Sequence, residues 1–123
     1  MDIARAFVAT GAVLGGLGMV MGIVMGVSED FTLSPAHAHL NLVGWVSLVL
    51  FGLAYRTRLA SLGALATVHY WVAAAGAIIL PIGIYVTMVR NQPVIAIIGA
   101  LLSLASMLIF IVNVWRAPPR VST

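Results

Sequence analysis

Four long apolar runs are the feature that most limits what this chain can fold into. They cover about residues 3–27, 35–55, 62–88 and 94–115, and only 7% of the 123 residues are charged. Each run has about the 20 residues that a helix needs to cross the hydrocarbon core of a bilayer. A spanning segment must also satisfy its own backbone polar groups, which a helix does. The sequence therefore predicts one all-α domain, residues 1–123, that forms an integral membrane four-helix bundle in the lipid bilayer.

The arginines predict how this bundle is oriented. Five of the six lie on the side of the two termini and the second loop: Arg5, Arg56, Arg58, Arg116 and Arg120. The other side has Arg90 together with Glu29 and Asp30. Because positive charge favours the cytoplasmic side, we expect both termini in the cytoplasm (N-in, C-in) of a multi-pass protein in a bacterial inner (plasma) membrane. Membrane orientation accounts for arginines at the ends of spans, so they do not indicate nucleic-acid binding and we expect no nucleic-acid partner.

The first run carries a row of glycines at spacings of about four residues: Gly11, Gly15, Gly18, Gly22 and Gly26. Small residues in such a row let membrane helices approach one another closely. We therefore expect this face of the first run to pack against another helix.

Two histidines near the start of the second run, His37 and His39, are the strongest indication of a function. Ser34 and Pro35 precede them, as a helix N-cap and a first helical residue. Ionisable side chains in a span are costly and indicate a function by default. Successive helix residues turn by about 100°, so the two side chains project about 200° apart and cannot hold one metal together. They suit two sites on opposite faces of the helix or, alternatively, are unligated side chains at the polar interface.

The residues that follow His37 are compatible with a haem. Asn41 and Gly44 lie on the same face, and Gly44 leaves room for a flat macrocycle. Imidazole is a common axial ligand of haem iron, and an apolar slot suits a porphyrin. Trp45 either lines that haem or anchors the bundle in the bilayer. The chain has no cysteine, which excludes disulfides and thiolate metal sites.

Residues 36–85 resemble part of subunit I of the haem–copper oxygen reductases and nitric oxide reductases. In that family one span begins with an H-x-H pair, of which one histidine binds the low-spin haem and the other the high-spin haem. His37-Ala38-His39 stands at the corresponding end of the second run. The next span of the family carries a histidine, then aromatic residues and a later glycine, to which His69-Tyr70-Trp71 with Gly76 is similar.

This resemblance implies a fold and an assembly. The large subunit of the family arranges twelve spans as three arcs of four helices. The four spans of this chain equal the number in one arc. Three copies would rebuild the ring as a homotrimer. Each b-type haem would then sit between neighbouring copies, held by His39 of one copy and His37 of the next.

The chain also departs from the catalytic members of that family. Their active site needs a copper ion held by three histidines, and this chain has three histidines in all. His69 is expected level with about Val49, about 15 Å from His39. It therefore either hydrogen-bonds inside the bundle or meets a haem propionate. The spans contain no acid that could relay protons, so we do not expect proton-pumping oxygen reduction.

Together these features predict a haem-b protein that transfers electrons, with a quinone or a periplasmic electron carrier as its partner. An iron with two imidazole ligands has no open position for a substrate, which favours electron transfer. Two alternatives stay open. Iron bound by one histidine alone would make the chain an open-site haem enzyme or a gas sensor. A chain without stoichiometric haem would be a copper-binding, haem-handling or oxidase-assembly protein.

Overall fold

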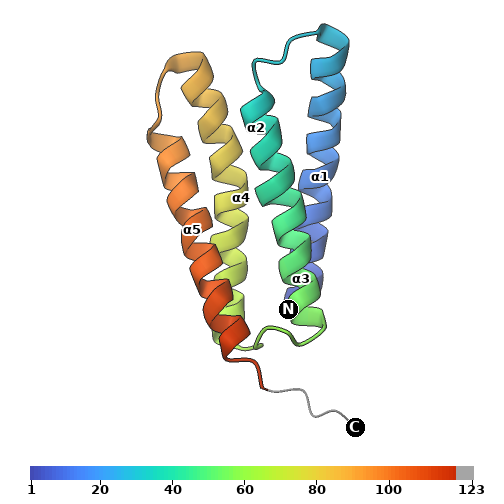
Figure 1. The fold of residues 1–123 in the computed structure, drawn as a ribbon, viewed down its shortest axis with the longest axis vertical. Coiled ribbons are helices and arrows are strands. Elements are labelled where there is room, and N and C mark those ends of the chain that lie inside the picture. The colour runs from blue at the N-terminus through green and yellow to red at the C-terminus, as the bar shows by residue number, and fades with distance from the viewer. Residues whose placement is uncertain (119–123) are drawn as a thin grey trace.

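The computed structural model describes residues 1–118 and is helical nearly throughout (Figure 1). Three spans are single helices: α1 (Ile3–Ser28), α4 (Ala64–Arg90) and α5 (Val94–Trp115). The second span is continuous but has three parts: α2 (Ser34–His39), the π-helix η1 (Leu40–Ser47) and α3 (Leu48–Arg56). All four spans are long and apolar enough to cross a membrane, and their bounds lie within two residues of the predicted ranges. The prediction of an all-helical bundle with four such helices is confirmed.

Local sequence sets where the first two spans begin. The Asp2 carboxylate caps α1 by accepting a hydrogen bond from the backbone N–H of Arg5 at 3.1 Å. Ser34, by contrast, is itself the first residue of α2, and its hydroxyl donates to the carbonyl of Phe31 at 2.7 Å. The prediction that Ser34 is the N-cap is therefore wrong, because its side chain turns back into the loop and Leu33 takes the capping position.

The four spans form two hairpins that lie side by side, α1 with the second span and α4 with α5 (Figure 1). Glycines let the backbones of α4 and α5 touch. A Cβ atom added to Gly76 would lie 2.8 Å from the hydroxyl of Ser103, and one added to Gly83 would collide with the backbone of Ala96. Close approach at small residues supplies the van der Waals contact that holds membrane helices together.

The glycine row of α1 packs against the second span, one glycine to each side chain. The four pairs are Gly22 with His37, Gly18 with Asn41, Gly15 with Trp45 and Gly11 with Val49. A Cβ on these glycines would lie 3.0, 2.5, 2.7 and 2.9 Å, in that order, from the nearest atom of its partner. The expected packing of the row is confirmed for these four glycines. It is wrong for Gly26, which faces open space because the row runs past the start of the second span.

The π-helix η1 explains how one row of side chains stays aligned with α1 over this length. In an α-helix every fourth residue advances about 40° beyond a full turn, so a row at four-residue spacing drifts around the helix. A π-helix has wider turns closed by bonds to the fifth residue, which offsets that drift. The hydroxyl of Ser47 accordingly donates to the carbonyl of Leu42, five residues earlier, at 2.8 Å. Thus residues 37, 41, 45 and 49 all meet α1.

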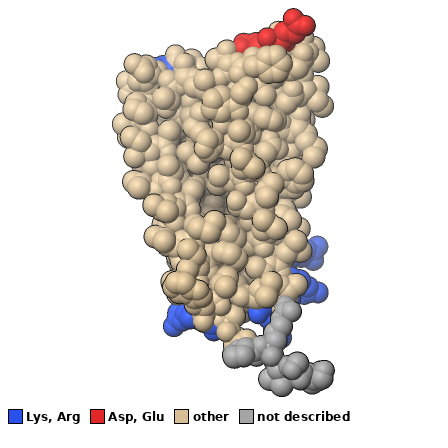
Figure 2. All heavy atoms as spheres, viewed as in Figure 1, with Lys and Arg blue, Asp and Glu red and all other residues tan. Residues whose placement is uncertain are grey.

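The charged residues separate to the two ends of the bundle (Figure 2). Glu29 and Asp30 lie at the end formed by the loop between α1 and α2, and most of the described arginines lie at the end where α1 begins and α5 ends (Figures 1 and 2). At the acidic end, the hydroxyl and the backbone N–H of Thr32 donate to Asp30 at 2.6 and 3.0 Å, which lowers the pKa of that carboxyl. Arg120, which the orientation prediction also uses, lies outside the described residues.

The contact of α4 with α5 can be tested with two equal substitutions. We expect Gly83→Leu to lower the free energy of unfolding by about 1–3 kcal/mol, because the added side chain must push the two backbones apart. Gly26→Leu is the matched control, since a Cβ there meets nothing within 4 Å. Reversible unfolding in mixed detergent micelles, followed by helicity, measures both variants. Equal stability of the two variants would contradict the close approach.

Candidate functional site

His37 and His39 lie against different helices, as their spacing predicts. His37 is half-buried and its ring packs on Gly22 of α1. His39 is exposed and lies at a groove between the second span, α4 and α5. The two imidazoles therefore face opposite sides of the same helix, and neither can join the other at one metal ion.

The imidazole of His39 is held in the form that a metal ligand needs. Its Nδ1 lies 2.8 Å from the carbonyl oxygen of Pro35. A carbonyl can only accept, so Nδ1 carries a proton, and in the neutral ring Nε2 then keeps its lone pair. Histidines that bind metals commonly donate their other ring N–H to a carbonyl in this way, which fixes the tautomer and the ring orientation. In this form His39 could bind a metal through Nε2.

The groove beside His39 has a volume of about 420 Å³ and is almost wholly apolar. Its walls come from α4 and α5, and include Leu80, Ile84, Met88 and Ile97. An imidazole lone pair and an apolar groove are two features that suit a haem.

His37 is held differently, through Asn41. The amide nitrogen of Asn41 lies 3.3 Å from Nδ1 of His37 and 2.9 Å from its carbonyl oxygen. Because that nitrogen can donate two hydrogen bonds, Nδ1 of His37 accepts one of them and the neutral ring carries its proton on Nε2. To bind a metal through Nε2, His37 would have to change tautomer and give up the bond from Asn41. His39 fits an iron as it stands, whereas His37 fits only after this change.

Gly44 and Trp45 both pack against α1. A Cβ on Gly44 would lie 3.2 Å from Cδ1 of Leu14, so the room expected over Gly44 is taken by that leucine. The indole of Trp45 covers Gly15 and stays 38% exposed. Asn41, Gly44 and Trp45 therefore all face α1, on the side of the second span away from the groove at His39.

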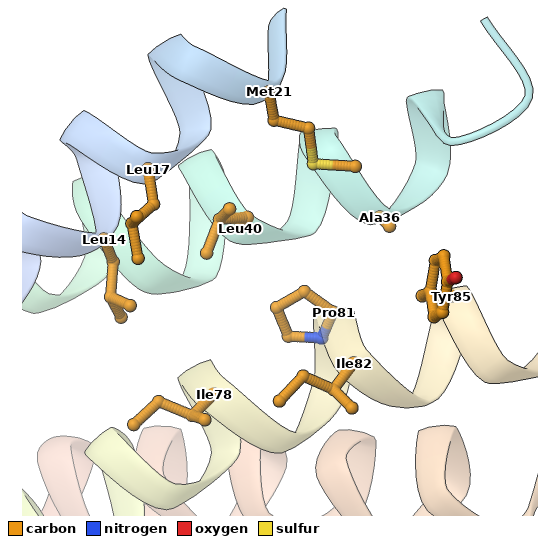
Figure 3. Close-up of a pocket in the computed structure, with 9 residues that line it drawn as sticks. All are labelled: Leu14, Leu17, Met21, Ala36, Leu40, Ile78, Pro81, Ile82 and Tyr85. Carbon is orange, nitrogen blue, oxygen red and sulfur yellow. The ribbon is translucent and has the colours of Figure 1, made fainter. Parts of the chain in front are cut away.

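A second apolar groove lies on the other side of α2, between α1, the second span and α4 (Figure 3). It has a volume of about 330 Å³, and its lining includes Leu14, Met21, Ala36, Pro81 and Tyr85 (Figure 3). The start of the second span thus separates two apolar grooves, and only the one at His39 has an imidazole in its lining.

His69 lies apart from the histidine pair, in the half of the bundle nearer the start of α1 and the end of α5. It is fully buried, and both ring nitrogens have partners: Nδ1 is 2.7 Å from the hydroxyl of Tyr55 and Nε2 is 3.1 Å from that of Ser106. Asn113 donates to the Tyr55 hydroxyl at 2.7 Å, which leaves that hydroxyl free to donate to His69. The expected hydrogen bonding of His69 inside the bundle is confirmed, and its partner in the second span is Tyr55.

Aromatic rings enclose this polar chain. Phe7, Phe51 and Phe110 lie with their ring centroids 5.0, 4.7 and 5.7 Å from the ring of His69. Sequence reasoning missed Tyr55, Ser106 and Asn113 as partners of His69. The available signal was an asparagine in the most apolar span, because a buried amide needs a hydrogen-bonding partner.

Within residues 1–118, no three His, Asp or Glu side chains gather closely enough to hold a metal ion. His39 could therefore serve a metal whose remaining ligands come with the cofactor, as in haem. No protein-family model, curated protein or solved structure matches this chain.

The buried polar chain can be tested by removing its central hydroxyl. Tyr55→Phe leaves His69 Nδ1 and the Asn113 amide without a partner, so we expect a loss of about 1–3 kcal/mol in the free energy of unfolding. Tyr85→Phe removes the same atom from a side chain that is 47% exposed and should change stability little. Unfolding of both variants in mixed detergent micelles makes the comparison. A Tyr55→Phe protein as stable as the Tyr85→Phe protein would show that the hydrogen bonds contribute nothing.

Proposed function

We propose that this chain is a haem-b-binding membrane protein that transfers electrons, with His39 as an axial ligand of the iron. One observation carries the proposal: His39 keeps a free Nε2 lone pair, fixed by the Pro35 carbonyl, at the edge of an apolar groove. When bound, a haem would supply a one-electron redox centre at this place. The groove would exclude water from the macrocycle, and the Pro35 carbonyl would hold the imidazole in position.

We propose further that neighbouring copies complete the site. His37 lies on the opposite side of the helix from His39, so it would serve the iron of a different copy. A homotrimer with one haem at each junction would satisfy this geometry and match the resemblance to one arc of the haem–copper oxidase fold. Two imidazoles on each iron favour electron transfer, with a quinone or a periplasmic electron carrier as the partner.

A second candidate function is an open-site haem protein, either a gas sensor or an enzyme. The observation that favours it is the hydrogen bond from Asn41 to Nδ1 of His37, which holds His37 in the tautomer that cannot bind through Nε2. If that bond persists in the holoprotein, the iron keeps one open position. Carbon monoxide binding to the reduced protein distinguishes the two candidates, because two strong axial ligands resist displacement.

The ligand assignment can be tested with His39→Ala and His37→Ala, purified in detergent after expression with sufficient haem. We expect His39→Ala to lose most of the haem absorbance. For the electron-transfer candidate, wild type should show sharp low-spin b-type bands that carbon monoxide does not shift, and His37→Ala should become sensitive to carbon monoxide. Light scattering should give the mass of three chains for wild type. Full haem content in His39→Ala would overturn the assignment of His39 as an axial ligand.

The orientation proposed for the bundle, with both termini in the cytoplasm, follows from the arginine distribution. The chain has no cysteine, so the reactivity of a single introduced cysteine shows on which side of the membrane its loop lies. We expect Gln92→Cys, between α4 and α5, to react with a membrane-impermeant maleimide in intact spheroplasts. Leu62→Cys, between α3 and α4, should react only after permeabilisation. The reverse pattern would invert the proposed topology.

A further inference from the structure

A groove with two arginines lies at the end of the bundle opposite the histidine pair. It runs between the start of α1 and the end of α3 and has a volume of about 410 Å³. Arg5 and Arg56 line it, and so do Val8 and Leu53, each three residues further into its span. At its base the helices touch, because a Cβ on Gly52 would lie 2.7 Å from Cγ2 of Val8.

The lining of this groove keeps a net positive charge. Arg5 and Arg56 are exposed, and within residues 1–118 neither guanidinium takes part in an ion pair. Asp2 is the only acid in the lining, and its carboxylate accepts the backbone N–H of Arg5 as the helix cap. The three formal charges of the lining therefore sum to one positive charge. A guanidinium offers a planar set of donors that matches the oxygens of a phosphate.

The rest of the lining is apolar, and Val8 and Leu53 are its accessible side chains. Leu53 is 49% exposed, and Val8 lies across the groove from it on α1. Arginines at the ends of membrane spans lie at the level of the lipid headgroups, with the hydrocarbon core beside the residues one turn deeper. The groove thus offers cationic donors at headgroup level and an apolar wall below, which is the polarity of a phospholipid molecule.

We propose that this groove binds one anionic phospholipid, with its phosphate between Arg5 and Arg56 and an acyl chain along Val8 and Leu53. Basic grooves between membrane helices on the cytoplasmic side are suited to such lipids, because that leaflet is rich in anionic headgroups. Inorganic phosphate could contact the two arginines but has no acyl chain to place against the apolar wall. Contact with that wall therefore distinguishes the lipid from the free anion. The site is independent of any haem and of the histidine pair.

The test is native mass spectrometry of the purified chain taken from nanodiscs that contain equal amounts of phosphatidylglycerol and phosphatidylcholine. Wild type should retain phosphatidylglycerol in preference to phosphatidylcholine. The double variant R5Q/R56Q should lose roughly 30-fold in affinity for phosphatidylglycerol, from about two arginine contacts at the membrane surface. The matched control R58Q/R116Q removes two charges from the same end of the bundle and should retain wild-type binding. Helicity measured by circular dichroism checks that both variants fold.

Three results would overturn the proposal. Retention of phosphatidylglycerol by R5Q/R56Q at the wild-type level would place the lipid elsewhere. An equal loss of phosphatidylglycerol in R58Q/R116Q would show that the lipid responds to the total positive charge at this end of the bundle and not to the groove. Release of the lipid by millimolar inorganic phosphate would make the groove a phosphate site, to which the wall of Val8 and Leu53 adds nothing.

Discussion

Backbone-to-backbone contact at glycine is the interaction on which the rest of this structure depends. Apolar side chains gain nothing by leaving lipid for one another, so membrane helices associate where small residues allow close van der Waals contact. In this chain Gly83 and Gly76 let α4 and α5 touch, and four glycines of α1 each receive one side chain of the second span. The same row that joins α1 to the second span also holds His37 and Asn41. The contact that joins α1 to the second span therefore also sets the position of His37, one of the two candidate ligands.

The second stabilising element is the buried polar chain of Asn113, Tyr55, His69 and Ser106, which joins the two hairpins. Alternative hydrogen-bond partners are scarce inside a bilayer, so each member depends on the next for its partner. The rings of Phe7, Phe51 and Phe110 pack around His69. One histidine of this chain thus serves the fold, while the other two lie at the far end of the bundle, where a cofactor could reach them.

The histidine pair shows how far sequence reasoning reaches at a site. The spacing of His37 and His39 fixed their divergence, because residues two apart on a helix point to opposite sides. It did not reveal that Pro35 orients His39 or that Asn41 bonds to His37, since both contacts depend on the detailed turns of the second span. Gly44 illustrates the limit most clearly. Its lack of a side chain suggested space for a ligand, but Leu14 from another helix fills that space.

The sequence by itself determined the number of spans, their ends to within two residues and the divergence of the histidines. Each of these follows from local rules: the thickness of a bilayer, the rise of a helix and its turn per residue. Only the tertiary structure decided which glycines of α1 are packed, that residues 40–47 form a π-helix, and that His69 meets Tyr55, Ser106 and Phe110. These features depend on how neighbouring helices are offset along their axes, and that offset is set by the fit of side chains from distant parts of the chain.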